Sequence, residues 1–265
     1  MIALLAAAGL AACSPAPSPK RRKLVDKITY GNDPSQFGEL SRAAGTSKGL
    51  VIVIHGGFWR SQYDLSLGRP LAASLTKNGW DAYNLEYRRV GNGGGWPRTF
   101  DDVAAGIDAL AGIDGLETSK VITLGHSAGG HLAVWAAGRK LTGTAWDAPV
   151  VAVTAAISQA GVLDLVAARS DDLGSGAVQA FMSGAVDGRY QRADPAAQIP
   201  LDVPVRCIHG KEDEVVPISQ SIRYVDRARS AGADAELVEV EGDHFVVIDP
   251  DSRAWARTLE ILEAL

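Results

Sequence analysis

The hexapeptide GHSAGG at residues 125–130 carries the strongest chemical signal in this 265-residue chain. An apolar run, Val121 to Leu124, leads into it, and a helix-like stretch from Ala128 to Lys140 follows. A strand that turns at once into a helix holds the residue between them, Ser127, on a strained and exposed corner. The glycines two residues to either side have no side chain to crowd that corner. The pattern predicts that Ser127 is a nucleophile able to attack a carbonyl carbon.

A serine hydroxyl is a weak nucleophile until a base removes its proton, and histidine is the usual base at neutral pH. The chain offers five histidines. We expect His126 to face away from the nucleophile and His131 to lie one helical turn on, so both are poor bases. His55 begins a glycine-rich loop, and His209 ends a strand before a turn. His244 follows the last predicted strand on a loop free to reach back over the sheet. We predict that His244 is the base rather than a surface histidine in a polar turn.

A carboxylate must orient the histidine and stabilise its charged form. The segment HGKEDEVVP at residues 209–217 lies just beyond a predicted strand and offers Glu212, Asp213 and Glu214. Charge alone does not distinguish among these neighbours. Asp243 is next to the base in sequence and is expected to point elsewhere.

Attack on a carbonyl places negative charge on its oxygen, and one backbone N–H donor aimed at that oxygen is worth about 3–4 kcal/mol of barrier. Ala128, directly after the nucleophile, supplies one such N–H. The segment HGGFW at residues 55–59 follows an apolar strand-like run and has two glycines that allow a tight fold. We predict that Gly57 and Phe58 supply the other donors. By itself the HGG sequence is also typical of a simple turn at the end of a strand. Its occurrence together with GHSAGG is a specific signal for an oxyanion loop.

The stretches between these motifs alternate between strand-like and helix-like patterns. Runs that are apolar on both faces predict a parallel sheet covered by helices, which gives a three-layer α/β domain. Residues 162–200 are rich in Asp, Gly and Ala and break the alternation, so they predict a cap inserted over the active site or a long functional loop. The expected strands are Leu50–Ile54, Ala82–Tyr87, Val121–Leu124, Val150–Ile157, Val205–Ile208 and Glu236–Val240, and the expected helices are Leu67–Asn78, Phe100–Gly112, Ala128–Arg139, Ile218–Ala231 and Ser252–Leu265.

Residues 1–12 have the length and apolar character of a signal peptide, too short to span a bilayer. They end in Leu-Ala-Ala before Cys13, which resembles the bacterial lipobox, where the cysteine is lipidated. Residues 13–23 then form a Pro/Ser-rich and basic tether, and 24–265 form the domain. We therefore expect an exported bacterial lipoprotein held at an envelope membrane, periplasmic or surface side, by Cys13. A plain signal peptide or a disordered tail is the alternative. Cys207, the second cysteine, is expected to be an inert core thiol.

Composition excludes some classes of function. The chain has 46% hydrophobic and 22% charged residues, as an ordinary globular domain does, and its formal net charge is −5. An acidic chain is a poor candidate for binding nucleic acid. No cluster has the spacing of zinc ligands, and the predicted chemistry needs no metal or organic cofactor.

The order of these motifs resembles that of an α/β-hydrolase from residue 45 onward. HGGFW is similar to the HGG-x-W loop of kynurenine formamidase-like and other carboxylesterase-like members, including BD-FAE-like proteins. Glu86-Tyr87-Arg88 resembles the D/E-Y-R of the lipase and esterase branch. The pattern HG-x-x-D-x-x-V-P resembles the family's acid loop, and this resemblance assigns the acid to Asp213. Phe58 departs from the HGGG of hormone-sensitive-lipase-like esterases and could narrow the acyl pocket.

The resemblance implies a serine hydrolase that cleaves a carboxylic ester or small activated amide through an acyl-enzyme. Two alternatives remain at this level, an arylformamidase or aminopeptidase-like amidase and a non-catalytic lipoprotein that binds a ligand. Sequence does not separate ester from amide because the two chemistries share the same triad. The expected site residues are Ser127, His244 and Asp213 in catalysis, Gly57, Phe58 and Ala128 in the oxyanion hole, and Trp59 and Trp96 in the substrate pocket.

Overall fold

A computed structural model of the chain describes residues 25–265. The predicted signal peptide (1–12), the predicted lipidation site Cys13 and the predicted tether up to residue 23 lie outside the described residues. Within residues 25–265, no helix has both the length and the apolar character needed to cross a membrane.

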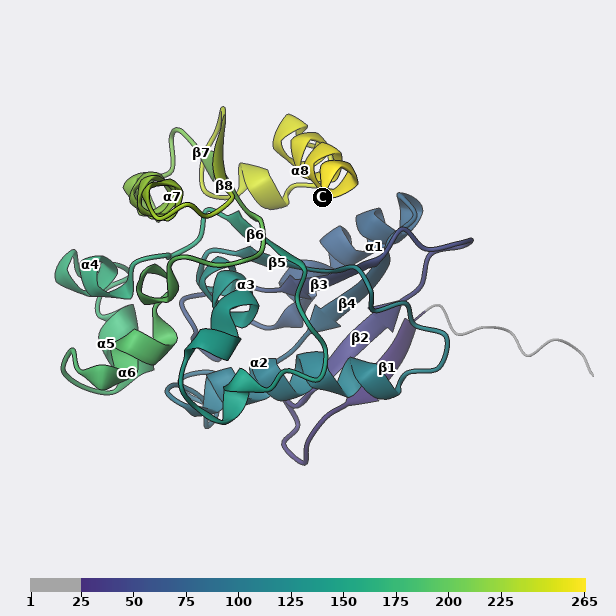
Figure 1. Ribbon diagram of the computed structural model, residues 1–265, viewed down its shortest axis with the longest axis horizontal. Helices are drawn as coiled ribbons and strands as arrows, with labels where there is room; N and C mark the ends of the chain where they lie inside the picture. Colours follow the sequence, from purple (N-terminus) through teal and green to yellow (C-terminus); the bar gives the residue numbers. More distant parts are fainter. Residues whose placement is uncertain (1–24) are drawn as a thin grey trace, which may run out of the picture.

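The centre of the fold is an eight-stranded sheet with the order β1-β2-β4-β3-β5-β6-β7-β8 (Figure 1). The pairs β1–β2 and β2–β4 are antiparallel and all the others are parallel. The mostly parallel sheet of the predicted α/β fold is therefore confirmed. The strands are β1 (Val25–Thr29), β2 (Phe37–Ser41), β3 (Leu50–Ile54), β4 (Asp81–Leu85), β5 (Val121–His126), β6 (Ala155–Gln159), β7 (Val205–Gly210) and β8 (Ala235–Val240).

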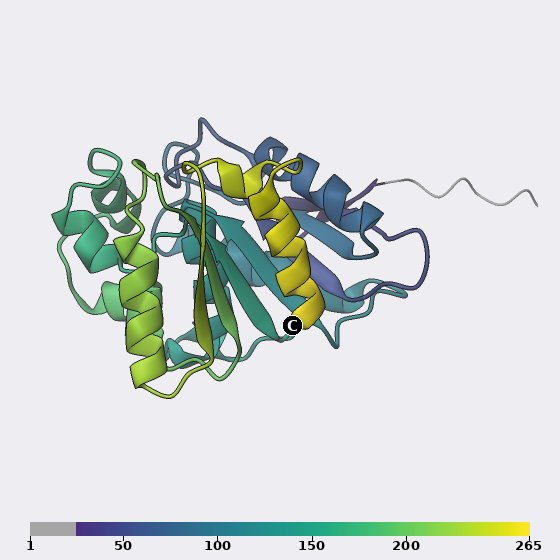
Figure 2. The ribbon, with the colours of Figure 1, turned by 90° about the horizontal axis from the view of Figure 1, so that it is seen from above.

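Helices cover both faces of the sheet, as the two views show (Figures 1 and 2). In β3, Leu50, Ile52 and Ile54 pack in a cluster with side chains of α2 and α3, whereas Val51 and Val53 pack in a cluster with side chains of α1 and α8. This two-sided burial explains why the strand is apolar at every position. The helices are α1 (Arg69–Lys77), α2 (Arg98–Asp108), α3 (Ala128–Gly138), α4 (Leu165–Ser170), α5 (Ala177–Met182), α6 (Gly188–Ala193), α7 (Ser219–Ser230) and α8 (Arg253–Ala264), with short 3₁₀ turns η1 (Leu65–Gly68), η2 (Ala109–Gly112), η3 (Arg139–Leu141), η4 (Ala145–Asp147), η5 (Pro195–Gln198) and η6 (Val246–Ile248).

The strand register brings the predicted motifs to one edge of the sheet. Ile54, the last residue of β3, pairs with Gly125 of β5, and His126 at the end of β5 pairs with Gln159 of β6. The loops that follow β3 and β5 therefore leave the sheet side by side. In parallel α/β sheets, this carboxyl edge is where ligands bind.

Two stretches differ from the sequence expectation. The strand expected at 150–157 begins later, as β6 at Ala155: Val150 is exposed, and residues 151–154 lie outside the strand although Val151 is buried. The antiparallel pair β1–β2 was not predicted; its outer strand β1 is mostly exposed and carries no continuous apolar run.

Residues 162–200, hereafter the cap segment, form α4, α5, α6 and η5, which gather beside α3 (Figure 1). Two side chains of α3 hold them in place. His131 Nε2 lies 2.8 Å from the Ala193 carbonyl oxygen, and Trp135 Nε1 donates to the Arg192 carbonyl oxygen at 2.9 Å. The cap segment is thus packed on the side of the domain through α3.

Candidate active site

Ser127 stands between the end of β5 and the start of α3 with φ +56° and ψ −119°. Positive φ is unfavourable for a residue with a Cβ, so surrounding contacts must fix it. Its N–H donates to the Gln159 carbonyl oxygen at 2.8 Å. Gly125 and Gly129 are required because neighbouring backbone lies too close to them for a side chain. A Cβ on Gly125 would lie 2.0 Å from the Gly129 carbonyl oxygen, and a Cβ on Gly129 would lie 2.0 Å from the Ile54 carbonyl oxygen.

His244 and Asp213 meet although they come from different loops, after β8 and β7. His244 Nδ1 lies 2.6 Å from Asp213 Oδ2, a short charge-assisted hydrogen bond. The other carboxylate oxygen of Asp213 accepts from the amides of Val215 and Val216, both at 2.8 Å. Glu212 instead accepts from the amide of Gly242. The structure therefore pairs Asp213, among the acidic residues of this loop, with the histidine.

His209, which the sequence analysis treats only as a strand end, is a further neighbour of the acid. Its Nε2 lies 3.1 Å from Asp213 Oδ2 and 2.9 Å from the Val216 carbonyl oxygen, and its Nδ1 lies 2.8 Å from Ser221 Oγ. Burial by itself would raise the pKa of Asp213, but hydrogen bonds from His209, His244 and Val216 outweigh it and hold that pKa well below its usual value. The i, i+4 spacing of His209 and Asp213 was the available signal.

Ser127 and His244 line the same pocket of about 150 Å³. Most of its wall is apolar, and the exposed side chains of Tyr63, Leu67 and Phe245 surround it. The pocket therefore brings the hydroxyl and the imidazole to one space that a small substrate can enter. Its lining residues are Gly57, Phe58, Tyr63, Leu67, His126, Ser127, Val215, His244, Phe245 and Ile248.

The segment His55–Trp59, hereafter the oxyanion loop, lies against the nucleophile. A Cβ on Gly56 would come within 3.2 Å of Ser127 Cβ. Among residues 25–265, no backbone or side-chain group accepts a hydrogen bond from the N–H of Gly57, Phe58 or Ala128. Gly57 and Phe58 line the pocket, and Ala128 opens α3, whose positive dipole end faces the same edge. These free donors can stabilise an oxyanion.

Behind the oxyanion loop lies a buried polar network. Tyr87 Oη donates to the His55 carbonyl oxygen at 2.7 Å, and His55 Nδ1 lies 2.8 Å from the Gly56 carbonyl oxygen. Burial lowers the pKa of His55 to about 3, so the ring is neutral. A neutral ring that donates from Nδ1 accepts at Nε2, where Nη1 of Arg89 lies 3.2 Å away. Arg89 in turn pairs with Glu86.

The sequence predicts that His126 faces away from the nucleophile. In the structure His126 instead lines the pocket beside the base. Its ring centroid is 4.4 Å from that of His244, and its Nε2 lies 2.9 Å from the His244 carbonyl oxygen. Burial, and secondarily the His244 charge, lowers the pKa of His126 to about 3. A neutral His126 that donates to this carbonyl holds the loop of the base in place.

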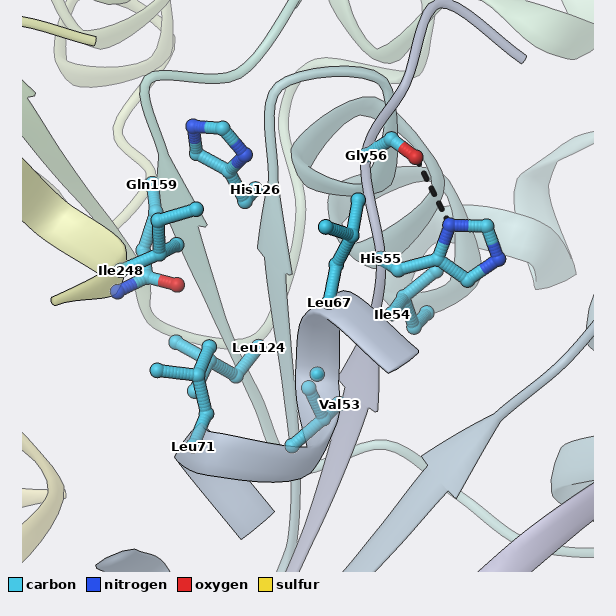
Figure 3. A pocket seen from close by; sticks show the side chains of 11 residues that line it. Val53, Ile54, His55, Gly56, Leu67, Leu71, Leu124, His126, Gln159 and Ile248 are labelled. Carbon is cyan, nitrogen blue, oxygen red and sulfur yellow. Dashed lines mark hydrogen bonds between the residues drawn. The ribbon is translucent and has the colours of Figure 1, made fainter. Parts of the chain in front are cut away.

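A second, much smaller cavity of about 10 Å³ lies next to the pocket (Figure 3). Its lining includes His126 and Gln159 on one side and His55 and Gly56 on the other. A site of this size holds at most about one water molecule. The larger pocket is therefore the space that can take a substrate.

The expectation that Trp59 and Trp96 line the substrate pocket is wrong. Trp59 is fully buried and stacks on Phe181, with ring centroids 4.6 Å apart, because the turn after Gly57 directs its ring inward. Trp96 packs edge-on against Phe100 and Trp146, at centroid distances of 5.3 Å and 5.6 Å. Neither lines the pocket of Ser127.

Comparison with known proteins gives a consistent picture. Residues 40–227 match the BD-FAE family. The chain is 27% identical over 224 residues to esterase LipC of Mycobacterium tuberculosis, covering 77% of this chain and 55% of that protein. It is 24% identical over 241 residues to isoprenylcysteine alpha-carbonyl methylesterase of Arabidopsis thaliana, covering 81% and 55%. The chain thus spans about half the length of the curated relatives it matches.

Solved structures show the same fold. An esterase B from Lactobacillus rhamnosis, inhibited by a tributyrin phosphonate, matches with a TM-score of 0.79 at 20% identity over 91% of this chain and 84% of that one. The butyrate-bound esterase Est2 of Thermogutta terrifontis matches with a TM-score of 0.74 at 20% identity, covering 91% and 92%. The expected α/β-hydrolase fold is confirmed.

Proposed function

The chain belongs to the BD-FAE family of α/β-hydrolases, and from this membership we propose that it is a serine esterase that cleaves carboxylic esters through an acyl-enzyme. One observation carries the proposal. The Asp213–His244 hydrogen bond reaches a pocket that also holds Ser127 and the free N–H groups of the oxyanion loop. Nucleophile, base, acid and oxyanion donors are the complete set for acyl transfer.

In the first half-reaction, Ser127 Oγ attacks the carbonyl carbon of the ester while His244 takes its proton. Asp213 occupies Nδ1 of His244, so Nε2 is the nitrogen that exchanges the proton. The depressed pKa of Asp213 keeps its carboxylate ionised, which stabilises the imidazolium that forms. The N–H groups of Gly57, Phe58 and Ala128 hold the oxyanion.

The tetrahedral intermediate then breaks its bond to the alcohol oxygen, and His244 returns the proton to that oxygen as the alcohol leaves. Ser127 is now acylated. A water molecule attacks the acyl carbon while His244 again accepts a proton, and collapse of the second intermediate releases the carboxylic acid and restores Ser127.

The pocket favours a short acyl chain. Its volume of about 150 Å³ is well below the roughly 300–1,000 Å³ of pockets that hold drug-sized ligands. The butyrate bound to Est2 and the tributyrin phosphonate that inhibits esterase B both present four-carbon chains, which are short enough for such a pocket. We expect kcat/KM for p-nitrophenyl esters to be highest at two to four acyl carbons and to fall at least roughly tenfold by eight. A rise with chain length would contradict the pocket assignment.

The direct test of the proposed function is Ser127→Ala. We expect it to lower ester hydrolysis by a factor on the order of 10⁴ or more, with an unchanged circular dichroism spectrum. Wild-type protein should react covalently with a fluorophosphonate probe and Ser127→Ala should not. Full activity in Ser127→Ala would overturn the proposal. N-formylkynurenine measured beside the esters tests the arylformamidase alternative.

We also propose that the protein is an exported bacterial lipoprotein, anchored to an envelope membrane through Cys13. The support is the apolar run of residues 1–12 and the Leu-Ala-Ala-Cys junction. The full-length chain expressed in a bacterial host should take up labelled palmitate and sediment with membranes, and Cys13→Ala should do neither. Equal membrane association of both forms would refute the anchor.

A further inference from the structure

The oxyanion loop holds an unfavourable backbone conformation. Phe58 and Trp59 are consecutive non-glycine residues, each with φ +54°, and they follow Gly57 at φ +111°. A left-handed conformation is unfavourable for a residue with a Cβ, which approaches the backbone too closely there. Such strain persists only where neighbouring groups over-determine it. The neighbours of this loop therefore decide where its N–H donors lie.

The first neighbour is the turn before α5 in the cap segment. The ring of Phe58 rests on Gly174 so closely that a Cβ there would lie 2.4 Å from Phe58 Cδ1. Nη2 of Arg60 donates to the Gly174 carbonyl oxygen at 2.7 Å and to that of Ser175 at 3.2 Å. The Arg60 guanidinium also lies 5.7 Å from the Phe58 ring centroid. This turn thus contacts both chain neighbours of Trp59, Phe58 in the oxyanion loop and Arg60 directly after it.

The second neighbour is α5 itself. The Trp59 indole stacks on Phe181 with an interplanar angle of 11°, and both rings are fully buried. Trp59 Nε1 donates to His131 Nδ1 at 3.2 Å, and the other nitrogen of His131 reaches the Ala193 carbonyl oxygen at 2.8 Å. A single hydrogen-bonded chain therefore runs from the loop through α3 into α6.

The cap segment makes these contacts without lining the pocket, since none of the pocket residues lies in 162–200. Its connection to the site runs through the oxyanion loop. We propose that the cap segment is the clamp that sets the position of the Gly57 and Phe58 N–H donors, with Arg60, Gly174 and Phe181 as positioning residues. This inference rests on the proposed esterase function.

A matched pair of glycine variants tests the clamp. Gly174 and Gly176 lie in the same turn with φ +65° and +74°, so alanine carries a similar backbone penalty at each. An added Cβ at Gly174 collides with the Phe58 ring, whereas at Gly176 it meets nothing within 4 Å. Gly174→Ala therefore requires the Phe58 ring and the Gly174 turn to move apart, whereas Gly176→Ala requires no such shift.

We expect Gly174→Ala to lower kcat for p-nitrophenyl butyrate roughly 10- to 100-fold with KM within about twofold of wild type, because the oxyanion donors act in the transition state. Affinity for phenylboronic acid, which becomes tetrahedral on Ser127, should fall in parallel. Gly176→Ala should stay within about threefold of wild type in kcat. Equal kinetics of the two alanine variants would overturn the clamp.

Arg60→Met provides a second test should Gly174→Ala fail to fold. It removes the guanidinium donors while keeping much of the apolar stem, and Arg69→Met, at an exposed ion pair with Glu39, is its control. Arg60→Met should lower kcat at least roughly fivefold, and Arg69→Met should not. The failure of this inference can be distinguished from the failure of the proposed function. If the wild-type protein does not hydrolyse esters, the proposed esterase function is rejected. If the wild type is active and the kcat values of Arg60→Met and Gly174→Ala are unchanged, the positioning role of the cap segment is rejected.

Discussion

Asp213 accepts hydrogen bonds from His244 and from the amides of Val215 and Val216, and the ring of a histidine outside the triad also lies against it. His209 reaches the same carboxylate oxygen as the base does, at 3.1 Å against 2.6 Å for His244. Donors to a carboxylate spread its charge and lower its attraction for a neighbouring cation. His209 therefore moderates how strongly Asp213 stabilises protonated His244.

His209→Phe removes this donor and keeps an aromatic ring in the site. Asp213 then holds the imidazolium more strongly, so we expect the acidic limb of the kcat/KM profile to move up by roughly half a pH unit. Ser221→Ala is the control, since it removes the partner of His209 Nδ1 and leaves the Asp213 contact in place. An unmoved limb in His209→Phe, measured by stopped-flow or plate assay from pH 5 to 8, would count against this role.

Several residue roles could be predicted from the sequence because their motifs are local. GHSAGG specifies a strand, a turn and a helix within one short segment, and the structure gives Ser127 the positive φ that this turn requires. The direction of Trp59 could not be predicted in this way. Its inward rotation depends on Phe181, more than one hundred residues away, and on a loop conformation that no local pattern specifies.

At the level of elements, the cap segment contains a buried carboxyl group, Asp194, at the junction of α6 and η5. Its side chain accepts from the Ala196 amide at 3.1 Å. Burial, with the nearby charge of Asp164 adding to it, raises the pKa of Asp194 to about 7. The unfolded chain releases this proton near pH 3.9, so between about pH 4 and 7 the folded protein binds more protons. Asp194 therefore costs the fold increasing stability as pH rises through that window.

Asp194→Asn removes the titration and keeps an oxygen for the Ala196 amide. We expect its stability relative to wild type to improve by roughly 1–3 kcal/mol between pH 5 and pH 8. Urea unfolding at the two pH values measures the change, and any cost of the amide that does not depend on pH cancels in the comparison. The same difference between the two proteins at both pH values would show that Asp194 ionises normally.

The existence of the cap segment was visible in the sequence as a break in the alternation of strands and helices, but its placement was not. The helices α4, α5 and α6 are each only six residues long, so they carry little amphipathic pattern to say which face is buried. Their position comes from contacts with α3 and the oxyanion loop. Alternating βα units, in contrast, constrain their own topology through the handedness of each crossover.

Over the whole molecule, buried histidines make the fold sensitive to acid. Burial lowers the pKa values of His55 and His126 to about 3 and that of His131 to about 4. In the unfolded chain each ring binds a proton near pH 6.5. Unfolding between about pH 4 and 6.5 therefore takes up three protons at these rings and releases one at Asp194, and stability must fall as pH falls.

The pKa values of these four groups predict how much the free energy of unfolding of the described domain changes with pH. Each net proton changes the free energy of unfolding by about 1.4 kcal/mol per pH unit, so partial titration of the four groups gives a loss of roughly 2 kcal/mol between pH 6 and pH 5. Urea titrations of the 25–265 domain at pH 7, 6 and 5 would measure it. His131→Gln should flatten the dependence by about one proton, because glutamine can still accept from Trp59 and donate toward Ala193 without titrating. A stability that is constant from pH 7 to 5 would mean that these rings are protonated inside the folded protein, which their burial opposes.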